Sequence, residues 1–341
     1  MTESPRTVSV IIPTHNRARL LPLTLFSVLR QQEVDLEVLV VDDGSTEDLR
    51  GVVGELNHPR VRLLRHESPQ GVSVARNRGV AEAGGRWIAF VDDDDLWAPD
   101  KLVMQVRAAE REGRGWAYAG SVNVSEDLRL LGGAPPADPD EVVAALPRTN
   151  LVPGGCSGVM VRRDWLPSDP FDPSLGTCAD WDLWIRLSRL GRPTGVTQPL
   201  VGYRVHDNNM SLDTLHTISE VAAIEARYGG PIDWARFYRH LARVALRADR
   251  HRLASQYYFK AATVDRNYRT RDFLPDLFEL AQGVGHRISN RIARALMTAP
   301  AARRPRPGRR YAAQWAWVEQ ARAWIDELAA YRRTLPDPPQ C

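Results

Sequence analysis

Four consecutive aspartates, Asp92 to Asp95, directly follow an apolar segment at 86–91. The continuous apolar, β-branched and aromatic content of that segment predicts a buried strand. Adjacent carboxylates repel one another, so a folded chain tolerates them at a strand end where a cation or several hydrogen-bond donors lie beside them. Mg²⁺ and Mn²⁺ prefer oxygen ligands and bind carboxylates together with substrate phosphates. The run therefore predicts a divalent-cation site, with a solvated acidic turn as the alternative.

The first hundred residues alternate between strand and helix patterns. Strands are expected at 8–12, 36–41, 61–64 and 86–91, and helices at 20–29 and 73–83. This alternation predicts right-handed βαβ units and a mostly parallel open sheet flanked by helices, with a Rossmann-like nucleotide-binding half. Ligands of open α/β sheets bind outside the carboxyl ends of the strands, which is where the acidic run falls.

Beyond the first hundred residues the pattern changes. Strands are expected at 116–124, 156–162 and 194–205, and helices at 139–146 and 179–190. After about residue 213 the chain is expected to be helical, with a helix–turn–helix pair over 237–262 and one last helix over 311–333.

Composition restricts the setting of the protein. A chain of 341 residues that is 43% hydrophobic can bury a sizeable core. Its three cysteines form no disulfide framework, and Cys156 and Cys178 are expected to be free thiols. The first six residues do not resemble a signal peptide, and the sequence has no apolar run of about 18 residues. We expect a cytoplasmic protein, with peripheral contact at the inner face of the membrane left open.

That membrane alternative depends on one basic segment. Arginines are dense over 285–310, and their spacing opposite isoleucine and leucine suggests an amphipathic surface helix. A solvated helix packing one face on the rest of the protein explains the same pattern. The net charge of +3 identifies no partner, and we expect no nucleic acid.

Several motifs occur in a fixed order over roughly residues 7–210. They are Val8-Ser9-Val10-Ile11-Ile12-Pro13-Thr14-His15-Asn16-Arg17, Val40-Val41-Asp42-Asp43-Gly44-Ser45, Gly71-Val72-Ser73-Val74-Ala75-Arg76-Asn77, the acidic run, Ala179-Asp180-Trp181-Asp182-Leu183-Trp184 and Tyr203-Arg204-Val205-His206. Together they resemble the inverting, nucleotide-sugar-dependent glycosyltransferases of family 2. The resemblance implies a GT-A fold, a nucleotide-diphosphate sugar donor, a hydroxyl acceptor on a glycan, lipid-linked or small molecule, and Mg²⁺ or Mn²⁺ as cofactor.

The resemblance also implies a domain plan. A GT-A catalytic domain is expected over 1–212, with a nucleotide-binding half at 1–100 and an acceptor half at 101–212. A helical region over 213–299, a Pro/Arg linker over 300–310, and a C-terminal helix with its tail over 311–341 are expected to follow.

The donor base is expected to lie beyond the first two strands. By resemblance, the residues that bracket the base are Pro13, Thr14, His15 and Asn16. Asp42 can accept a hydrogen bond from the imide N–H of a base, as the family uses this position, although a helix cap is its alternative role. An imide-bearing base favours UDP, and dTDP shares that edge.

The helix from Ser73 is expected to carry a donor-binding arginine. Gly71 permits close backbone approach, and Arg76 can pair with the diphosphate or a base edge. Asn77 can support Arg76, and a surface ion pair is the alternative for the arginine.

Within the acidic run, extended geometry would place alternate side chains on opposite sides. The family's Asp-X-Asp signature overlays most naturally on Asp92-Asp93-Asp94. It implies Asp94 as metal ligand and Asp92 or Asp93 near the ribose, with a one-residue uncertainty of register. Asp95 has capping of the helix near Pro99 as its alternative.

Asp180 is the candidate general base. It opens the helix at 179–190, where free backbone N–H groups keep a carboxylate ionised. Inverting transfer needs one carboxylate to take the proton of the acceptor hydroxyl. Many family members have Glu-Asp here, whereas this chain has Ala179-Asp180, which puts an acceptor-side contact in doubt. A structural N-cap is the alternative role for Asp180.

Three further residues complete the expected site. His206 can complete the divalent site or contact the diphosphate, as the resemblance implies, although single histidines often lie on surface loops. Gly155 and Trp181 are expected to border the acceptor, because flat rings suit sugar faces, and Trp184 is either there or in the core.

Two other function classes stay open. A Mg²⁺-dependent phosphotransferase would need a nucleophilic aspartate after the first strand, where this chain has Pro13-Thr14, and no P-loop pattern is present. A non-catalytic protein that binds an anionic surface or a nucleotide sugar would use the basic 285–310 segment or the strand-end pocket without chemistry.

Overall fold

The computed structural model describes residues 7–206, 210, 213–247, 250–264 and 309–335. These residues belong to two compact units. The first consists of 1–146, 150–204 and 313–341, and the second of 147–149 and 205–312. Most of the basic 285–310 segment and of the expected linker at 300–310 lies outside the described residues.

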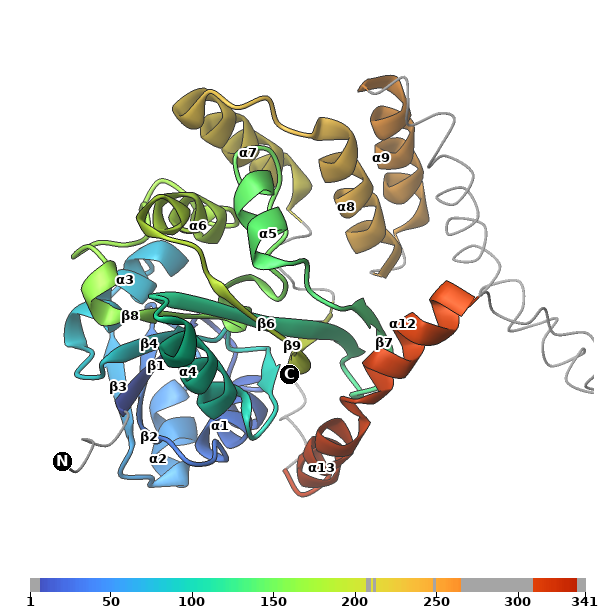
Figure 1. The fold of residues 1–341 in the computed structure, drawn as a ribbon. Coiled ribbons are helices and arrows are strands. Elements are labelled where there is room, and N and C mark those ends of the chain that lie inside the picture. Colours follow the sequence, from blue (N-terminus) through green and yellow to red (C-terminus); the bar gives the residue numbers. More distant parts are fainter. Residues whose placement is uncertain (1–6, 207–209, 211–212, 248–249, 265–308, 336–341) are drawn as a thin grey trace, which may run out of the picture. The chain divides into compact units, whose positions relative to one another are not determined.

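The first unit is built on one sheet of nine strands among the described residues (Figure 1). The strands are β1 Thr7–Thr14, β2 Asp35–Asp42, β3 Val61–Arg65, β4 Trp87–Phe90, β5 Leu96–Trp97, β6 Trp116–Ser125, β7 Leu130–Ala134, β8 Val159–Arg162 and β9 Thr194–Val205. Their order is β3-β2-β1-β4-β8-β6-β9-β5, with β7 paired to β6. Strands β3, β2, β1 and β4 are parallel, and β8, β6 and β7 join antiparallel, so the sheet is mixed.

Helices flank this sheet, which confirms the expected α/β class. They are α1 Leu21–Leu29, α2 Leu49–Leu56, α3 Val72–Glu82, α4 Lys101–Glu112, α5 Pro139–Ala145 and α6 Ala179–Leu190. Helix α3 packs on β1 and β2, and α4 packs on β6, in front of the sheet in Figure 1. The strands β1, β2 and β4 are mostly apolar and buried because both faces of the sheet are covered there, which is typical of parallel sheets.

The strand predicted at 156–162 is shorter than expected. Residues Gly155–Gly158 form a 3-10 turn, and β8 begins only at Val159. Gly154 and Gly155 have φ values of +71° and +52°, which only glycine adopts readily, so the chain turns there before it can extend.

The second unit contains α7 Thr214–Tyr228, α8 Trp234–Arg247 and α9 His251–Val264. Helices α8 and α9 form the expected helix–turn–helix pair, with Leu241 and Tyr257 in their shared core. No helix among the described residues combines the length and the apolar character needed to span a membrane.

The single helix expected over 311–333 is two helices, α12 Arg309–Glu319 and α13 Arg322–Arg332, drawn in red in Figure 1. The indole nitrogens of Trp317 and Trp324 donate to the main-chain oxygens of Thr197 and Pro199 on β9. Seven helical residues rise about 10.5 Å, whereas two strand residues span about 6.7 Å. The break between α12 and α13 brings Trp317 and Trp324 closer together than one continuous helix would, and so both indoles reach β9.

Candidate active site

The strand order places a topological switch point between β1 and β4 at the carboxyl edge of the parallel strands. From β1 the chain adds β2 and β3 on one side and then β4 on the other side of β1. The loops after β1 and β4 therefore leave the sheet in opposite directions, and ligands of open α/β sheets bind at this kind of switch point. The loop after β1 begins at His15, and the acidic run follows β4.

Strand register brings the candidate base-binding residues into one row. Thr14 pairs with Asp42, and Asp42 pairs with Arg65. The Asp42 side chain is fully buried; its Oδ1 accepts from Ser45 N at 2.9 Å, and its Oδ2 pairs with Arg65. Arg65 is 42% exposed and also donates to the main-chain oxygen of Ser45. Arg65 therefore occupies the carboxylate of Asp42.

His15 and Asn16, which are also expected at the base, link the loops after β1 and β2. His15 Nδ1 lies 2.8 Å from the main-chain oxygen of Asp43. The side-chain oxygen of Asn16, which has a φ of +52°, accepts from Thr46 N at 2.8 Å. Asn16 N donates to the Ser45 hydroxyl. These bonds hold the loop after β1 against the loop after β2. Pro13 is buried in β1 itself.

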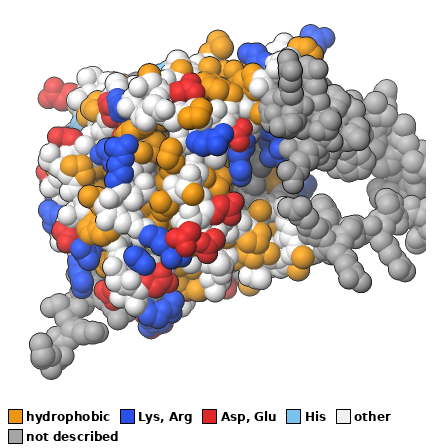
Figure 2. Space-filling view, turned by 45° about the horizontal axis from the view of Figure 1, so that its top comes forward, with side chains coloured by type: hydrophobic (Ala, Val, Ile, Leu, Met, Phe, Trp, Pro, Cys, Tyr) orange, Lys and Arg blue, Asp and Glu red, His pale blue; other side chains and the backbone are white. Residues whose placement is uncertain are grey.

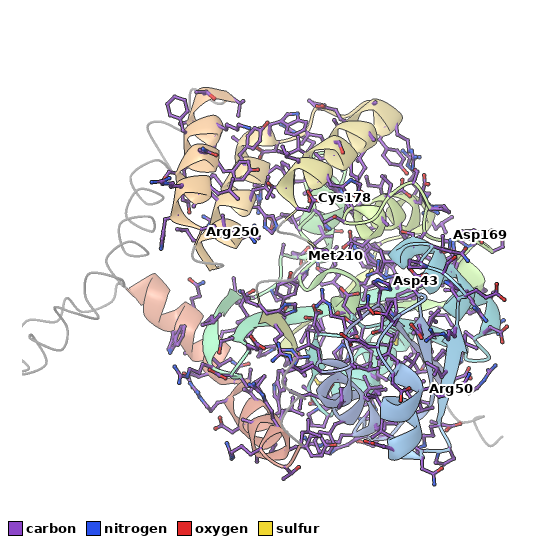
Figure 3. The ribbon with its side chains drawn as sticks, turned by 180° about the vertical axis from the view of Figure 1, so that it is seen from behind. Asp43, Arg50, Asp169, Cys178, Met210 and Arg250 are labelled. Atoms are coloured by element: carbon purple, nitrogen blue, oxygen red, sulfur yellow. The ribbon has the colours of Figure 1, made fainter. Side chains whose placement is uncertain are left out.

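Asp43, labelled in Figure 3, fixes the loop that leads into α3. Its two carboxylate oxygens accept from Gln70 N at 2.9 Å and from Gly71 N at 2.8 Å. His66 Nδ1 lies 2.7 Å from the same carboxylate. Gly71 has a φ of +98°, so only a residue without a side chain enters α3 here without strain.

Arg76 points from the first turns of α3 into the acidic run. Its Nη2 donates to Asp92 Oδ1 at 2.6 Å, and its guanidinium lies 5.3 Å from the ring centre of Phe171. Burial by itself lowers the pKa of Arg76, but Cys156, Asp92 and Asp180 raise it by more, so the pKa lies above its ordinary value. A cation and two carboxylates therefore share one electrostatic cluster.

Asn77 supports Arg76 indirectly. Its side-chain amide donates to Phe171 O at 2.7 Å and accepts from Phe171 N at 2.9 Å. It thus fixes the phenylalanine whose ring lies against Arg76.

The acidic run forms a turn, and the expected extended alternation of its side chains is wrong. Asp95 N donates to Asp92 O at 3.0 Å, and β5 starts directly after Asp95. The Thr24 hydroxyl bonds Asp93 O, and the Ser157 hydroxyl accepts from Asp92 N, so the turn is held from two sides. The chain changes direction between β4 and β5 within these four residues, so the four aspartates cannot stay extended.

Two carboxyl groups in this turn are buried at an energetic cost. Burial, followed by the charge of Asp94, raises the pKa of Asp93 to about 8, although Thr14 and Arg17 favour its ionised form. Burial and the neighbouring charges of Asp94 and Asp92 raise the pKa of Asp95 well above its usual range. Asp95 Oδ2 is buried and has no hydrogen-bond partner. Buried carboxylate oxygens with too little positive charge beside them are suitable ligands for a hard divalent cation.

Two arginines that sequence reasoning left without a role donate hydrogen bonds to this turn. Arg204 is 2% exposed; its Nε donates to Asp94 O at 2.5 Å and its N to Asp95 Oδ1 at 3.1 Å. Arg17 Nη1 donates to Asp94 Oδ2 at 3.1 Å. Asp95 is therefore held by Arg204 and does not cap α4, whose N-cap is Asp100. Both arginines stood in motifs of the sequence. For Arg204 a signal was present, because a charge within a strand pattern requires a partner of opposite charge when the strand is buried.

Asp180 lies in the first turn of α6, as expected. Its Oδ1 accepts from Trp181 N at 2.6 Å. A Cβ atom built on Gly155 would lie 3.5 Å from Asp180 Oδ2, so Gly155 keeps space beside this carboxylate.

Cys156 and Cys178 are buried free thiols, as predicted, and burial raises the pKa of Cys156 well above its usual range. Cys178, the residue directly before α6, is labelled in Figure 3.

The tryptophans of α6 are buried. Trp181 is 4% exposed, and its Nε1 donates to Leu146 O at 2.8 Å. Trp184 is fully buried and stacks on Trp116, which places it in the core. His206 is also buried; it directly follows β9 and belongs to the second unit.

The distribution of charged side chains on the surface does not indicate a binding partner. On the face shown in Figure 2, basic and acidic side chains of the described residues are interspersed with hydrophobic ones. This mixed distribution agrees with the small net charge of +3.

Comparison with solved structures identifies the fold. The mannosyltransferase PcManGT of Pyrobaculum calidifontis, solved with GDP-Man and Mn²⁺, is 20% identical and has a TM-score of 0.51, over 95% of this chain and 88% of its own. Staphylococcus aureus TarS 1–349, solved with UDP-GlcNAc, is 16% identical with a TM-score of 0.52, over 96% of this chain and 91% of its own. These likenesses confirm the expected GT-A type of fold.

Comparison of sequences identifies the family. The model of glycosyl transferase family 2 matches residues 9–166. The Escherichia coli enzyme UDP-Glc:alpha-D-GlcNAc-diphosphoundecaprenol beta-1,3-glucosyltransferase WfgD is 30% identical over 180 residues, which are 53% of this chain and 69% of WfgD. The chain is a glycosyltransferase and belongs to family 2.

Proposed function

We propose that this glycosyltransferase moves a sugar from a UDP-sugar to an acceptor hydroxyl with inversion at the anomeric carbon and with the help of Mg²⁺ or Mn²⁺. The observation that carries the proposal is the cluster of Arg76, Asp92 and Asp180 at the switch point of the sheet. It combines a cation for a diphosphate with a carboxylate that can accept a proton.

The donor would lie along the carboxyl edge. Asp42 would accept from the imide N–H of uracil once Arg65 moves aside, and the loop at 13–16 would bracket the base. Gly71 would allow the diphosphate close to the backbone, and Arg76 would pair with it. The name of WfgD states a UDP-Glc donor, which supports UDP before dTDP.

The acidic turn would hold the divalent ion. Asp94 would be a ligand, and Asp92 or Asp93 would lie near the ribose. Among the described residues, no three His, Cys, Asp or Glu side chains already form a metal cluster. A bound ion would therefore complete its coordination with diphosphate oxygens, as Mg²⁺ commonly does. It would supply positive charge for the departing diphosphate.

Asp180 would act as the general base. Its place in the first turn of α6 favours the ionised form, and Gly155 leaves room beside it. The carboxylate would take the proton of the acceptor hydroxyl while the hydroxyl attacks the anomeric carbon opposite the diphosphate. A β-linked product from an α-linked donor requires inversion, and the name of WfgD states a beta-1,3 product.

The acceptor is proposed only as a class. WfgD acts, by its name, on a diphosphoundecaprenol-linked sugar, which supports a lipid-linked glycan and a peripheral membrane contact here. Gly155 is the candidate acceptor-side residue. Trp181 would serve the same site by fixing α6, because its ring is 4% exposed.

Slow hydrolysis of the donor tests this function without a known acceptor. The chain is mixed with UDP-glucose and MnCl₂, and the first glucose anomer released is followed by NMR. Inversion predicts that β-glucose appears first and equilibrates later. Release of α-glucose first would contradict inversion, and release at the same rate with EDTA would contradict a metal role.

A further inference from the structure

Arg17 lies in the loop after β1, and its main chain is fixed at the entry to α1. Its main-chain oxygen accepts from the backbone N–H groups of Leu20 and Leu21 at 3.0 and 3.1 Å, at the entry to α1. Its Nη1 donates to Asp94 Oδ2 at 3.1 Å. The two side chains are 18% and 12% exposed, so the pair lies at the rim of the site and not inside the core.

The three arginines of the acidic turn divide their roles. Arg76 donates to the carboxylate of Asp92, and Arg204 donates to the main-chain oxygen of Asp94. Arg17 donates to the Asp94 carboxylate itself. A guanidinium and a divalent ion that use the same carboxylate compete for it, because each repels the other over such a short distance.

We propose that Arg17 is the counter-cation of the metal site: it holds Asp94 in the metal-free enzyme, releases it to the divalent ion, and then binds the donor diphosphate. This inference rests on the proposed function, which places the ion at Asp94. In this exchange the divalent ion replaces Arg17 as the positive partner of Asp94, so the carboxylate has a positive partner throughout. The planar guanidinium presents two parallel N–H groups that match two phosphate oxygens, whereas a lysine ammonium acts as a point charge.

A purely structural ion pair makes the opposite prediction. If Arg17 served to orient Asp94 for the metal, its removal would weaken metal binding. If Arg17 competes with the metal, its removal strengthens the binding of metal alone and weakens the binding of the diphosphate. The sign of the change therefore separates the two roles.

The experiment uses the full chain and the Arg17→Gln variant. Free Mn²⁺ is titrated by electron paramagnetic resonance without nucleotide, and UDP is then titrated calorimetrically at saturating Mn²⁺. The matched control is Arg19→Gln, two residues along, because Arg19 is 51% exposed and pairs with Glu126 instead. We expect Arg17→Gln to bind Mn²⁺ alone at least about fivefold more tightly, and UDP about tenfold more weakly, whereas Arg19→Gln matches the wild type.

Arg17→Lys keeps the charge and serves as a second variant if Arg17→Gln unfolds. It should leave the Mn²⁺ affinity near that of the wild type and weaken UDP, because the two-bond geometry is lost. Unchanged or weaker Mn²⁺ binding by folded Arg17→Gln, or unchanged UDP binding by Arg17→Lys, overturns this inference alone. Absence of Mn²⁺ binding by the wild type, with and without UDP, overturns the proposed metal site and this inference with it.

Discussion

Arg204 on β9 lies beside Asp94, which precedes the short strand β5. Leu96 pairs with Gly202, and the same register continued by two residues brings Arg204 to Asp94. The Arg204 Nε then donates to the main-chain oxygen of Asp94 at 2.5 Å. The buried guanidinium thus places positive charge directly beside the acidic turn.

Removal of this guanidinium should destabilise the fold. Arg204→Met removes one buried positive partner of the acidic turn, and we expect a loss of about 3–5 kcal/mol in the free energy of unfolding. Urea unfolding measures it. Arg129→Met, an exposed arginine of the same unit, should change stability by less than about 0.5 kcal/mol. Equal stability of the two variants would contradict the role given to Arg204.

Asp180→Asn should separate chemistry from donor binding. An amide cannot accept the proton, so donor turnover should fall by about 10²- to 10⁴-fold while the UDP affinity stays the same. Turnover is followed by UDP release, and affinity by calorimetry.

The control for this variant lies in the same helix. Asp182 is 1% exposed and pairs with Arg186, so Asp182→Asn should cost about 1–3 kcal/mol of stability and keep turnover per folded molecule. If Asp180→Asn lost UDP binding together with turnover, its role would be structural.

Asp43→Ala should loosen the loop that positions Arg76. It leaves two backbone N–H groups and His66 without their acceptor, and we expect a loss of about 1–3 kcal/mol of stability and about tenfold weaker UDP binding. Asp48→Ala is matched, because it removes the N-cap of α2 for about 1 kcal/mol and lies away from Arg76 in the sequence. Equal UDP affinities of the two variants would contradict the prediction.

Lys101 predicts a stability that depends on pH. It is fully buried; its Nζ donates to Gln105 at 2.7 Å and lies 4.0 Å from the ring centre of Trp97. Burial lowers the pKa of Lys101 well below its usual value. Between this lowered pKa and the unfolded-state pKa of about 10.4, the unfolded chain binds more protons, so stability gains from this group as pH rises.

Lys101→Met removes that dependence. We expect the variant to gain stability relative to the wild type near pH 7, and the advantage to shrink toward pH 10. Denaturant unfolding at several pH values measures the difference. A difference that stays constant over this range would show that Lys101 has the same pKa in both states.

The parallel half of the fold was predictable because its signals are local. The apolar runs at β1, β2 and β4 and the helical spacing of α3 and α6 appear within short windows of sequence. Helix α2 was missed because it is short and follows a turn signal. Strand β7 was missed because Gly132 and Gly133 read as a loop, although they pair with Asn123 and Val122 on β6.

The sequence identified which residues form the candidate site better than it identified the contacts between them. Asp92, Arg76 and Asp180 belong to motifs, and the structure brings them into one electrostatic cluster. The closure of Asp42 by Arg65 was not predictable, because it depends on the register between β2 and β3. The partnership of Arg204 with Asp94 likewise depends on a pairing between segments more than a hundred residues apart.

The most direct test of the account is the affinity for UDP with and without Mn²⁺, measured by calorimetry on the wild type and on Asp94→Asn. The account predicts that Mn²⁺ tightens UDP binding to the wild type by at least about tenfold, or about 1.4 kcal/mol, and leaves Asp94→Asn unchanged. UDP affinity that ignores Mn²⁺ in the wild type, or the same tightening in both proteins, would contradict a divalent ion held by this turn.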